Sequence, residues 1–423
     1  MAWLYLRILP PLAVGIAAVL VLLPTMGYGF TNLDDDELVL DRQPFLTGPS
    51  AVSRAFSEPY FGKDSRSYYR PIVTLSFMAD ARLGGAAPAV YHRTNLLLHA
   101  LASMLLYLFL RRLRLDTVPA LFGALLFALH PVHAASCAWI PGRNDILLTI
   151  FALGAALSLP AEASSISLPR TVLHALLFAA ALLSKETAFI LPLLFIGMRY
   201  AEGFSVKAAQ LFAVWGTAIG AVLLLRARAV ETPPALFVDA ALTAVHRIPV
   251  LLSDLGKVVF PFQLQVLASP KDLHFAPGIA AALLLGALIY FLPRLRSGRT
   301  AFAAALFLLP SFIGLAGAER VVLENRLYLP IVGLALFLAT LLEIAASTSI
   351  RRRISTGAAV VLVALFAREL SFQLAPYENP NVFAARAIRD APNSGIAVNL
   401  LRRSTFQRRP PLSSKKVSRP PVQ

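Results

Sequence analysis

Charged residues are scarce in this chain, and their scarcity excludes an ordinary soluble protein. Asp, Glu, Lys and Arg make up only 15% of the 423 residues, whereas 57% are hydrophobic and the mean hydropathy is +0.68. Soluble domains carry about 25% charged residues. Apolar stretches long enough to cross a bilayer recur from one end of the chain to the other. This composition predicts an all-α polytopic membrane protein in a lipid bilayer.

Cysteine is nearly absent as well. Cys137 is the only one in the sequence, so an intramolecular disulfide and a thiolate metal cluster are both excluded. Acidic residues are in the minority, with 23 Asp and Glu against 39 Lys and Arg and a formal net charge of +16. Because much of the positive charge falls in short loops between apolar stretches, it indicates membrane topology and no nucleic-acid partner.

Apolar length predicts about eleven transmembrane helices, two of them short. We read the first as a retained span, because it is long, lacks a clear small-residue cleavage site and is followed by more spans. The candidates cover residues 8–30, 94–110, 118–138, 145–160, 171–184, 187–199, 208–225, 277–292, 301–317, 328–346 and 354–373.

The basic loops predict the orientation of these helices. Three arginine clusters fall on one side if the N-terminus is cytoplasmic, in agreement with the excess of Lys and Arg in cytoplasmic loops. Residues 31–93 and 226–276 then form two long outer loops. In the second loop, Val245–Val266 is apolar but broken by Pro249 and Pro261, which predicts an interfacial helix rather than a span. The clusters are Arg111, Arg112 and Arg114; Arg294, Arg296 and Arg299; and Arg351, Arg352 and Arg353.

The first outer loop opens with four consecutive acidic residues, Asp34, Asp35, Asp36 and Glu37. Mutual repulsion should raise the pKa of some of these carboxylates. A carboxylate at the membrane edge is what a reaction needs when it removes a proton from a hydroxyl. A solvated loop start without chemistry is the simpler alternative. The four carboxylates could also hold Mg²⁺ or Mn²⁺, and we leave this cofactor open.

Basic and histidine side chains are expected at the same outer face. Arg70 comes directly before Pro71, at the predicted start of an amphipathic helix, where it could pair with an acid of the loop or bind a phosphate. His130 and His133 end the third predicted span. They could ligate a metal, but Pro131 breaks the helix between them and no third ligand is fixed, so we predict hydrogen bonding to the acidic loop or to the substrate and assign no metal site.

Two further positions follow the same pattern. Arg143 lies in a tight turn before the fourth span and is either an anion contact or part of a purely structural turn. Lys185 and Glu186 separate two short apolar segments, where Lys185 could hold a phosphate or the pair could simply neutralise itself. Arg326, at the start of the tenth span, is a second phosphate candidate, and Tyr328 suits the interfacial aromatic belt.

Histidines near the start of the second span have a simpler interpretation. His92, Asn95 and His99 lie at helical spacing, and we expect them to form hydrogen bonds between helices. Taken together, carboxylates and cations at one membrane face match the needs of a transferase with a lipid-phosphate donor. A carboxylate would serve as the base, and the cations would stabilise the leaving phosphate.

Six segments carry a resemblance to a known family. They read NLDDDELVL, YYRPIVTLSFMADARL, YHRTNLLLHAL, FALHPVHAASCAWIPGRNDIL, LLSKETAFILPLL and ENRLYLP, and they follow one another across most of residues 31–330. The chain resembles the GT-C membrane glycosyltransferases, and within them the transmembrane-and-tetratricopeptide-repeat O-mannosyltransferases and their bacterial relatives. The resemblance implies a GT-C-type bundle of about eleven transmembrane helices with a large outer first loop.

The resemblance also implies an activity. It is the inverting transfer of mannose or another hexose from a polyprenyl-phosphate carrier to a protein or glycan acceptor. Asp34 would be the base or orient the acceptor, with Asp35 as its partner. Asp36 and Glu37 leave this register open by one residue. Lys185 would lie near the donor phosphate, and His130 and His133 would support the site.

The resemblance further implies where the protein acts. Together with the cytoplasmic N-terminus that the basic loops predict, it suggests a bacterial inner membrane and a periplasmic active site. Residues 1–375 would form the transmembrane domain and residues 376–402 a single hairpin similar to the first tetratricopeptide repeat. Residues 403–423, rich in Arg, Lys, Ser and Pro, are expected to be disordered.

The sequence departs from the family pattern at two points. Asn325 stands where the family has a glutamate before its arginine, and no repeat array follows the hairpin, as after a truncation or frameshift. A transporter or lipid flippase is the rival function, although its ionisable residues would lie near the midplane and its halves would repeat. An inactive membrane scaffold that displays the hairpin also stays open.

Overall fold

The computed structural model describes residues 2–62, 68–159, 167–201, 208–230, 248–291, 311, 321–346 and 349–407. Within these ranges the chain is built of helices, and an isolated bridge between Ala268 and Val322 is the only β pairing. This confirms the predicted all-α class. Five helices are long and apolar enough to cross a membrane, or six if one bent pair counts as a span. The protein is therefore a multi-pass helical membrane protein.

Ten of the eleven predicted spans coincide with described helices, one of them in two pieces, and 301–317 lies outside the described residues apart from Ser311. Four of the matching helices are short, so the count of eleven stays a prediction. The matching helices are α1 (Ala2–Leu22), α5 (Pro88–Arg112), α6 (Thr117–Ala128), α8 (Arg143–Ser158), α9 (Leu168–Leu182), α10 (Leu191–Ala201), α11 (Ala208–Ala229), α14 (Ala276–Phe291), α16 (Pro330–Ala345) and α17 (Ser349–Leu374).

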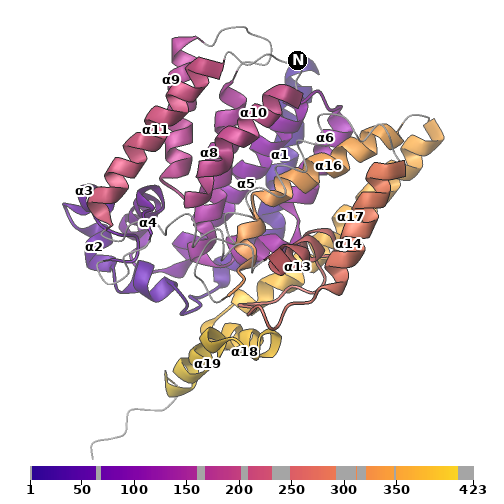
Figure 1. The fold of residues 1–423 in the computed structure, drawn as a ribbon. Coiled ribbons are helices and arrows are strands. Elements are labelled where there is room, and N and C mark those ends of the chain that lie inside the picture. The colour runs from indigo at the N-terminus through magenta and orange to yellow at the C-terminus, as the bar shows by residue number, and fades with distance from the viewer. Residues whose placement is uncertain are drawn as a thin grey trace, which may run out of the picture.

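The short helices of the predicted outer loops gather at the end of the bundle opposite the N-terminus (Figure 1). Both long loops and the C-terminal hairpin contribute to this group. The end that holds them is the one predicted to face outward. These helices are α2 (Gln43–Thr47), α3 (Ala51–Ser57), α4 (Pro71–Gly84), α13 (Ile248–Val259), α18 (Pro380–Asp390) and α19 (Gly395–Gln407).

The third predicted span is broken where the sequence predicts. Helix α6 ends at Ala128, and the chain resumes in the 3₁₀ turn η3 (Pro131–His133) and the short helix α7 (Ala134–Cys137) at an angle of 42°. Pro131 lacks the N–H that a continuous helix requires. The His130 side chain caps the new turn by accepting a hydrogen bond from Val132 N at 3.3 Å. The break directs the chain back into the core before α8 begins.

The second outer loop contains a helix that is too short to span. Helix α13 has 12 residues, or about 18 Å of length, against a hydrocarbon core of about 30 Å. Pro249 lies in its first turn and Pro261 follows its end. The segment thus forms a helix shorter than a membrane span, and its interfacial position stays a prediction. Gly256 and Gly278 let α13 pack closely on α14.

The C-terminal hairpin consists of α18 and α19. The side chain of Asn379 caps α18 by accepting from Asn381 N and Val382 N, both at 3.1 Å. Helix α19 continues to Gln407, so it extends into the segment predicted as a disordered tail from residue 403. The sequence from 408 to 423 lies outside the described residues.

Gly278→Ala is expected to destabilise the protein. An added Cβ would lie 1.8 Å from Leu252 O, and overpacking of this kind costs about 1–3 kcal/mol. In the same helix, Gly286→Ala is the control, because nothing lies within 4 Å of its added Cβ. That change should stabilise by about 0.5–1 kcal/mol, since glycine weakens a helix.

The melting temperatures of both variants can be measured in detergent with a thiol-reactive fluorophore. Cys137 is the only thiol in the sequence and is buried, so it reports unfolding. Equal melting temperatures for the two variants would contradict the close packing of α13 on α14.

Candidate functional site

The acidic run is anchored by one buried member. Asp35 is 1% exposed and accepts hydrogen bonds from Thr31 N at 2.7 Å and from the Thr31 hydroxyl. Asn32 adopts a φ of +56°, which asparagine tolerates, and thereby turns the chain back on itself. Asp34 is partly exposed, and Glu37 is exposed on the short helical turn Asp36–Leu40.

Burial raises the pKa of Asp35 to about 7, and the hydrogen bonds from Thr31 oppose this rise. The pKa of Asp36 is raised for the same main reason. The predicted direction is therefore confirmed, but its chief cause is burial and not repulsion along the run. A carboxylate that titrates near neutral pH is suited to proton transfer.

Lys185 does not pair with its neighbour Glu186. Its ammonium donates to both carboxylate oxygens of Asp145 at 2.6 Å and to Asn144 Oδ1 at 3.3 Å. Glu186 instead accepts from Arg70 at 2.9 and 3.2 Å. Two long-range ion pairs thus replace the local Lys185–Glu186 pair that the sequence suggested. Arg70 pairs with an acidic residue outside its own loop.

Asp145 joins a second segment to this pair. Asn325 Nδ2 donates to Asp145 Oδ2 at 2.7 Å, in a position where the resemblance leads one to expect a glutamate. The adjacent Arg326 is half-buried. Both Arg326 and Arg70 lie close enough to Lys185 to interact electrostatically with its ammonium. The structure thus brings the three predicted phosphate-binding cations into one group.

Sequence reasoning missed an ion pair beneath the second outer loop. Lys257 Nζ lies 3.0 Å from Glu324 Oε1, which also accepts from Gln265 N at 2.7 Å. Burial raises the pKa of Asp254, one turn earlier in α13, to about 6; Glu324 adds to the rise, while Lys257 and Arg326 counteract it. The available signal was the pair of charged residues within an otherwise apolar segment.

Arg143 is completely buried and fully engaged. It pairs with Asp80 at 2.6 Å and donates to Asn95 Oδ1 at 2.6 Å, Tyr91 O at 2.9 Å and Ser76 Oγ at 3.2 Å. Its Nε, Nη1 and Nη2 atoms all have partners within the protein. This geometry favours the structural alternative for Arg143 over an anion contact.

The histidines lie inside the bundle. His130 Nε2 is 3.0 Å from Val258 O, and the ring of His133 packs 4.3 Å from that of Tyr328. His99 contacts the Tyr328 hydroxyl at 2.6 Å and Ala128 O at 2.9 Å, so the predicted hydrogen bonding between helices is confirmed. Tyr328 is fully buried, and its predicted place in the aromatic belt is wrong because it packs among these rings. In the described ranges, no three His, Cys, Asp or Glu side chains converge as metal ligands.

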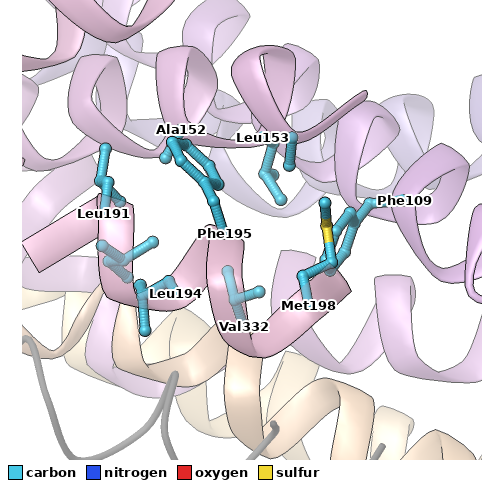
Figure 2. Close-up of a pocket in the computed structure, with 10 residues that line it drawn as sticks. Phe109, Ala152, Leu153, Leu191, Leu194, Phe195, Met198 and Val332 are labelled. Atoms are coloured by element: carbon cyan, nitrogen blue, oxygen red, sulfur yellow. The ribbon is translucent and has the colours of Figure 1, made fainter. Parts of the chain in front are cut away.

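A small apolar pocket of about 20 Å³ lies deeper in the bundle (Figure 2). Its lining includes Leu191 and Leu329, which follow the Lys185 and Arg326 segments in the chain, and Phe109 near the far end of α5. Its lining residues are all hydrophobic, so it suits an apolar group and excludes a charged one. The lining residues are Phe109, Ala152, Leu153, Ala156, Leu191, Leu194, Phe195, Met198, Leu329 and Val332.

Curated proteins are similar to part of this chain, whereas no protein-family model matches it. Tmtc1 of Drosophila melanogaster is 32% identical over 186 residues, which are 43% of this chain and 21% of that protein. For TMTC2 of Mus musculus the identity is 39% over 124 residues, or 28% and 15% of the two chains. TMTC3 of Mus musculus is 33% identical over 161 residues, or 36% and 17%.

All three relatives are named protein O-mannosyl-transferases. The resemblance derived from the six segments is therefore confirmed by the similarity to proteins of this type. The matched part of the chain spans about a fifth or less of the length of each relative.

Asp145→Asn is expected to lower the stability of the folded protein by about 3–5 kcal/mol, because it leaves the buried Lys185 without a countercharge. Arg54→Gln is the control: it breaks the 2.8 Å pair with Glu58 at an exposed position, which should cost about 0–1 kcal/mol. Thermal unfolding reported by Cys137 measures both. Small and similar losses of stability in the two variants would show that the pair of Lys185 with Asp145 contributes little to the stability of the folded protein.

Proposed function

We propose that this chain is a membrane glycosyltransferase of the GT-C type, related to the O-mannosyl-transferases named above. It transfers mannose or another hexose from a polyprenyl-phosphate carrier to a hydroxyl of a protein or glycan acceptor. One observation carries the proposal: the acidic run and the group of Arg70, Lys185 and Arg326 lie at the same end of the bundle. The names of the relatives point in the same direction.

The proposed reaction uses these residues in a defined order. Asp34 accepts the proton of the acceptor hydroxyl while its oxygen attacks the anomeric carbon from the face opposite the phosphate. The bond from that carbon to the phosphate oxygen breaks, and the configuration inverts. Lys185, Arg326 and Arg70 stabilise the negative charge that develops on the leaving phosphate. Asp35, held by Thr31, fixes the run from which Asp34 projects.

The hydrocarbon tail of the carrier would lie against the hydrophobic residues that line the apolar pocket. Two of these residues, Leu191 and Leu329, follow the segments that bear Lys185 and Arg326 in the chain. A lipid phosphate needs this combination, because its headgroup requires cations and its tail requires an environment free of unpaired polar groups.

The acceptor would approach from the side of the C-terminal hairpin. The hairpin, which we propose is similar to a tetratricopeptide repeat, contacts the second outer loop through Asn393 Nδ2 and Asp272 Oδ1 at 2.6 Å. Arg403 of α19 is close enough to Asp36 to interact with it electrostatically. Glu37 is exposed on this side and is available to an acceptor, whereas His130 and His133 support the site through packing.

The proposed orientation places this end of the bundle in the periplasm of a bacterium and the N-terminus in the cytoplasm. It is supported by the arginines that end α5, Arg111 and Arg112, because the chain that leaves α5 there lies at the opposite end from the acidic run. Cytoplasmic loops carry such basic residues in excess.

Asp34→Asn is expected to reduce transfer by about 10²–10⁴-fold, the usual contribution of a general base. Purified protein in lipid vesicles would receive radiolabelled polyprenyl-phosphate mannose, glucose or galactose with a membrane extract as acceptor. Asp41→Asn, an exposed carboxylate in the same loop, is the matched control and should keep full activity. Full activity of both Asp34→Asn and Asp35→Asn would overturn the mechanism.

The pH profile should depend on Thr31. If Asp35 must be ionised, the transfer rate rises with pH through the pKa of Asp35, about 7. The Thr31 hydroxyl lowers that pKa, so Thr31→Val should move the midpoint of the rise to higher pH. Thr47→Val removes a hydroxyl that donates to Gln43 O at an exposed site and should leave the midpoint unchanged. Identical midpoints in all three proteins would exclude a role for Asp35 ionisation.

A further inference from the structure

Two buried polar atoms beside Arg70 lack hydrogen-bond partners in other described residues. They are the hydroxyl of Tyr60, a residue that is 3% exposed, and Glu186 Oε1. Buried polar groups are nearly always paired, because leaving one unpaired forfeits its hydration without return. Two such atoms around one arginine therefore call for a common explanation, and a bound ligand provides one.

The surroundings of these atoms define the shape of the site. The Arg70 guanidinium lies 5.3 Å from the centre of the Tyr60 ring and 4.5 Å from that of Tyr68. Both of its hydrogen bonds to Glu186 go to Oε2, at 2.9 and 3.2 Å, so Oε1 takes no part in the pair. Tyr60 N donates to Tyr68 O at 2.8 Å and fixes the two tyrosines relative to each other.

The chemistry of the group selects a neutral polyhydroxyl ligand. A phenol hydroxyl both donates and accepts, whereas a carboxylate oxygen only accepts, so together they can bind neighbouring hydroxyls. An anion placed against Glu186 Oε1 would be repelled by that carboxylate, so the leaving phosphate would have to meet Arg70 on another side of its guanidinium. The aromatic rings offer apolar faces for the C–H side of a sugar. A hexose fits these requirements, and a phosphate does not.

We propose that Tyr60 and Glu186 form the subsite that binds the hydroxyls of the donor hexose. This inference rests on the proposed transfer function and deepens it. In the chain, Glu186 directly follows Lys185, which is the proposed phosphate contact. Tyr60 interacts electrostatically with Asp34, which is the proposed base. The subsite therefore lies between the base and the leaving phosphate, where a transferred sugar must sit.

Tyr60→Phe tests the subsite, because it removes the hydroxyl and keeps the ring. The melting temperature should stay the same or rise, since an unpaired buried group is lost. The wild-type protein should prefer one sugar donor, and Tyr60→Phe should reduce kcat/KM for that donor by about three- to tenfold. Affinity for polyprenyl phosphate without a sugar, measured by titration of the purified protein in nanodiscs, should not change.

Deoxy donors and a control variant separate the possible results. A donor that lacks the hydroxyl bound by Tyr60 should be transferred equally well by wild-type protein and Tyr60→Phe. Tyr69→Phe removes a hydroxyl that donates to Phe56 O at 2.9 Å and should leave sugar preference unchanged. Glu186→Gln should reduce kcat/KM for the preferred donor more than Tyr60→Phe does, because hydrogen bonds to charged groups are stronger.

Three results would overturn the subsite. Normal transfer and unchanged sugar preference in Tyr60→Phe would do so and leave the transferase function intact. A lower melting temperature in Tyr60→Phe, with equal losses for every donor, would reveal a structural hydroxyl. Failure of the wild-type protein to transfer or bind any of the sugar donors would overturn both the subsite and the proposed function.

Discussion

The buried ammonium of Lys185 is the constraint on which the rest of the site depends. A charge taken out of water must be paired, and Lys185 is paired by Asp145 instead of its neighbour Glu186. Glu186 is thereby left for Arg70, and Asp145 Oδ2 also accepts from Asn325. This exchange of partners joins four segments that are distant in sequence and holds three cations at one end of the bundle.

The same constraint explains why an asparagine fits at position 325. Its Nδ2 atom lies 2.7 Å from Asp145 Oδ2 and donates to it. A glutamate with its carboxylate in that place would repel Asp145, because like charges at short distance disfavour ionisation of one another. The departure from the family pattern is thus compatible with an intact network, and Arg326 keeps its position beside Lys185. Arg143 and Asp80 form a second buried pair that secures the start of α8 against α4 and α5.

Local patterns in the sequence were sufficient for the helices and for where they stop. The break before Pro131, the hairpin α18–α19 and the short helix between Pro249 and Pro261 all follow from proline, caps and apolar length. The grouping of the cations was also predictable from topology, since each follows or precedes a span that ends on the same side. The position of Tyr328 was not predictable, because an aromatic residue at the start of a span can face the interface or the core. Its packing against His99 and Phe127 decides that it faces the core.

The sequence by itself determined that this is a polytopic helical membrane protein, which residues can carry charge at its membrane face, and which family it resembles. Only the tertiary structure decided which charges neutralise one another, which carboxylate titrates near pH 7, and which polar atoms are left without partners. The physical reason is distance along the chain. Lys185 and Asp145 are 40 residues apart, whereas periodicity and composition report on a few neighbouring turns. The partners of a buried charge and the degree of its burial are properties of the packed helices.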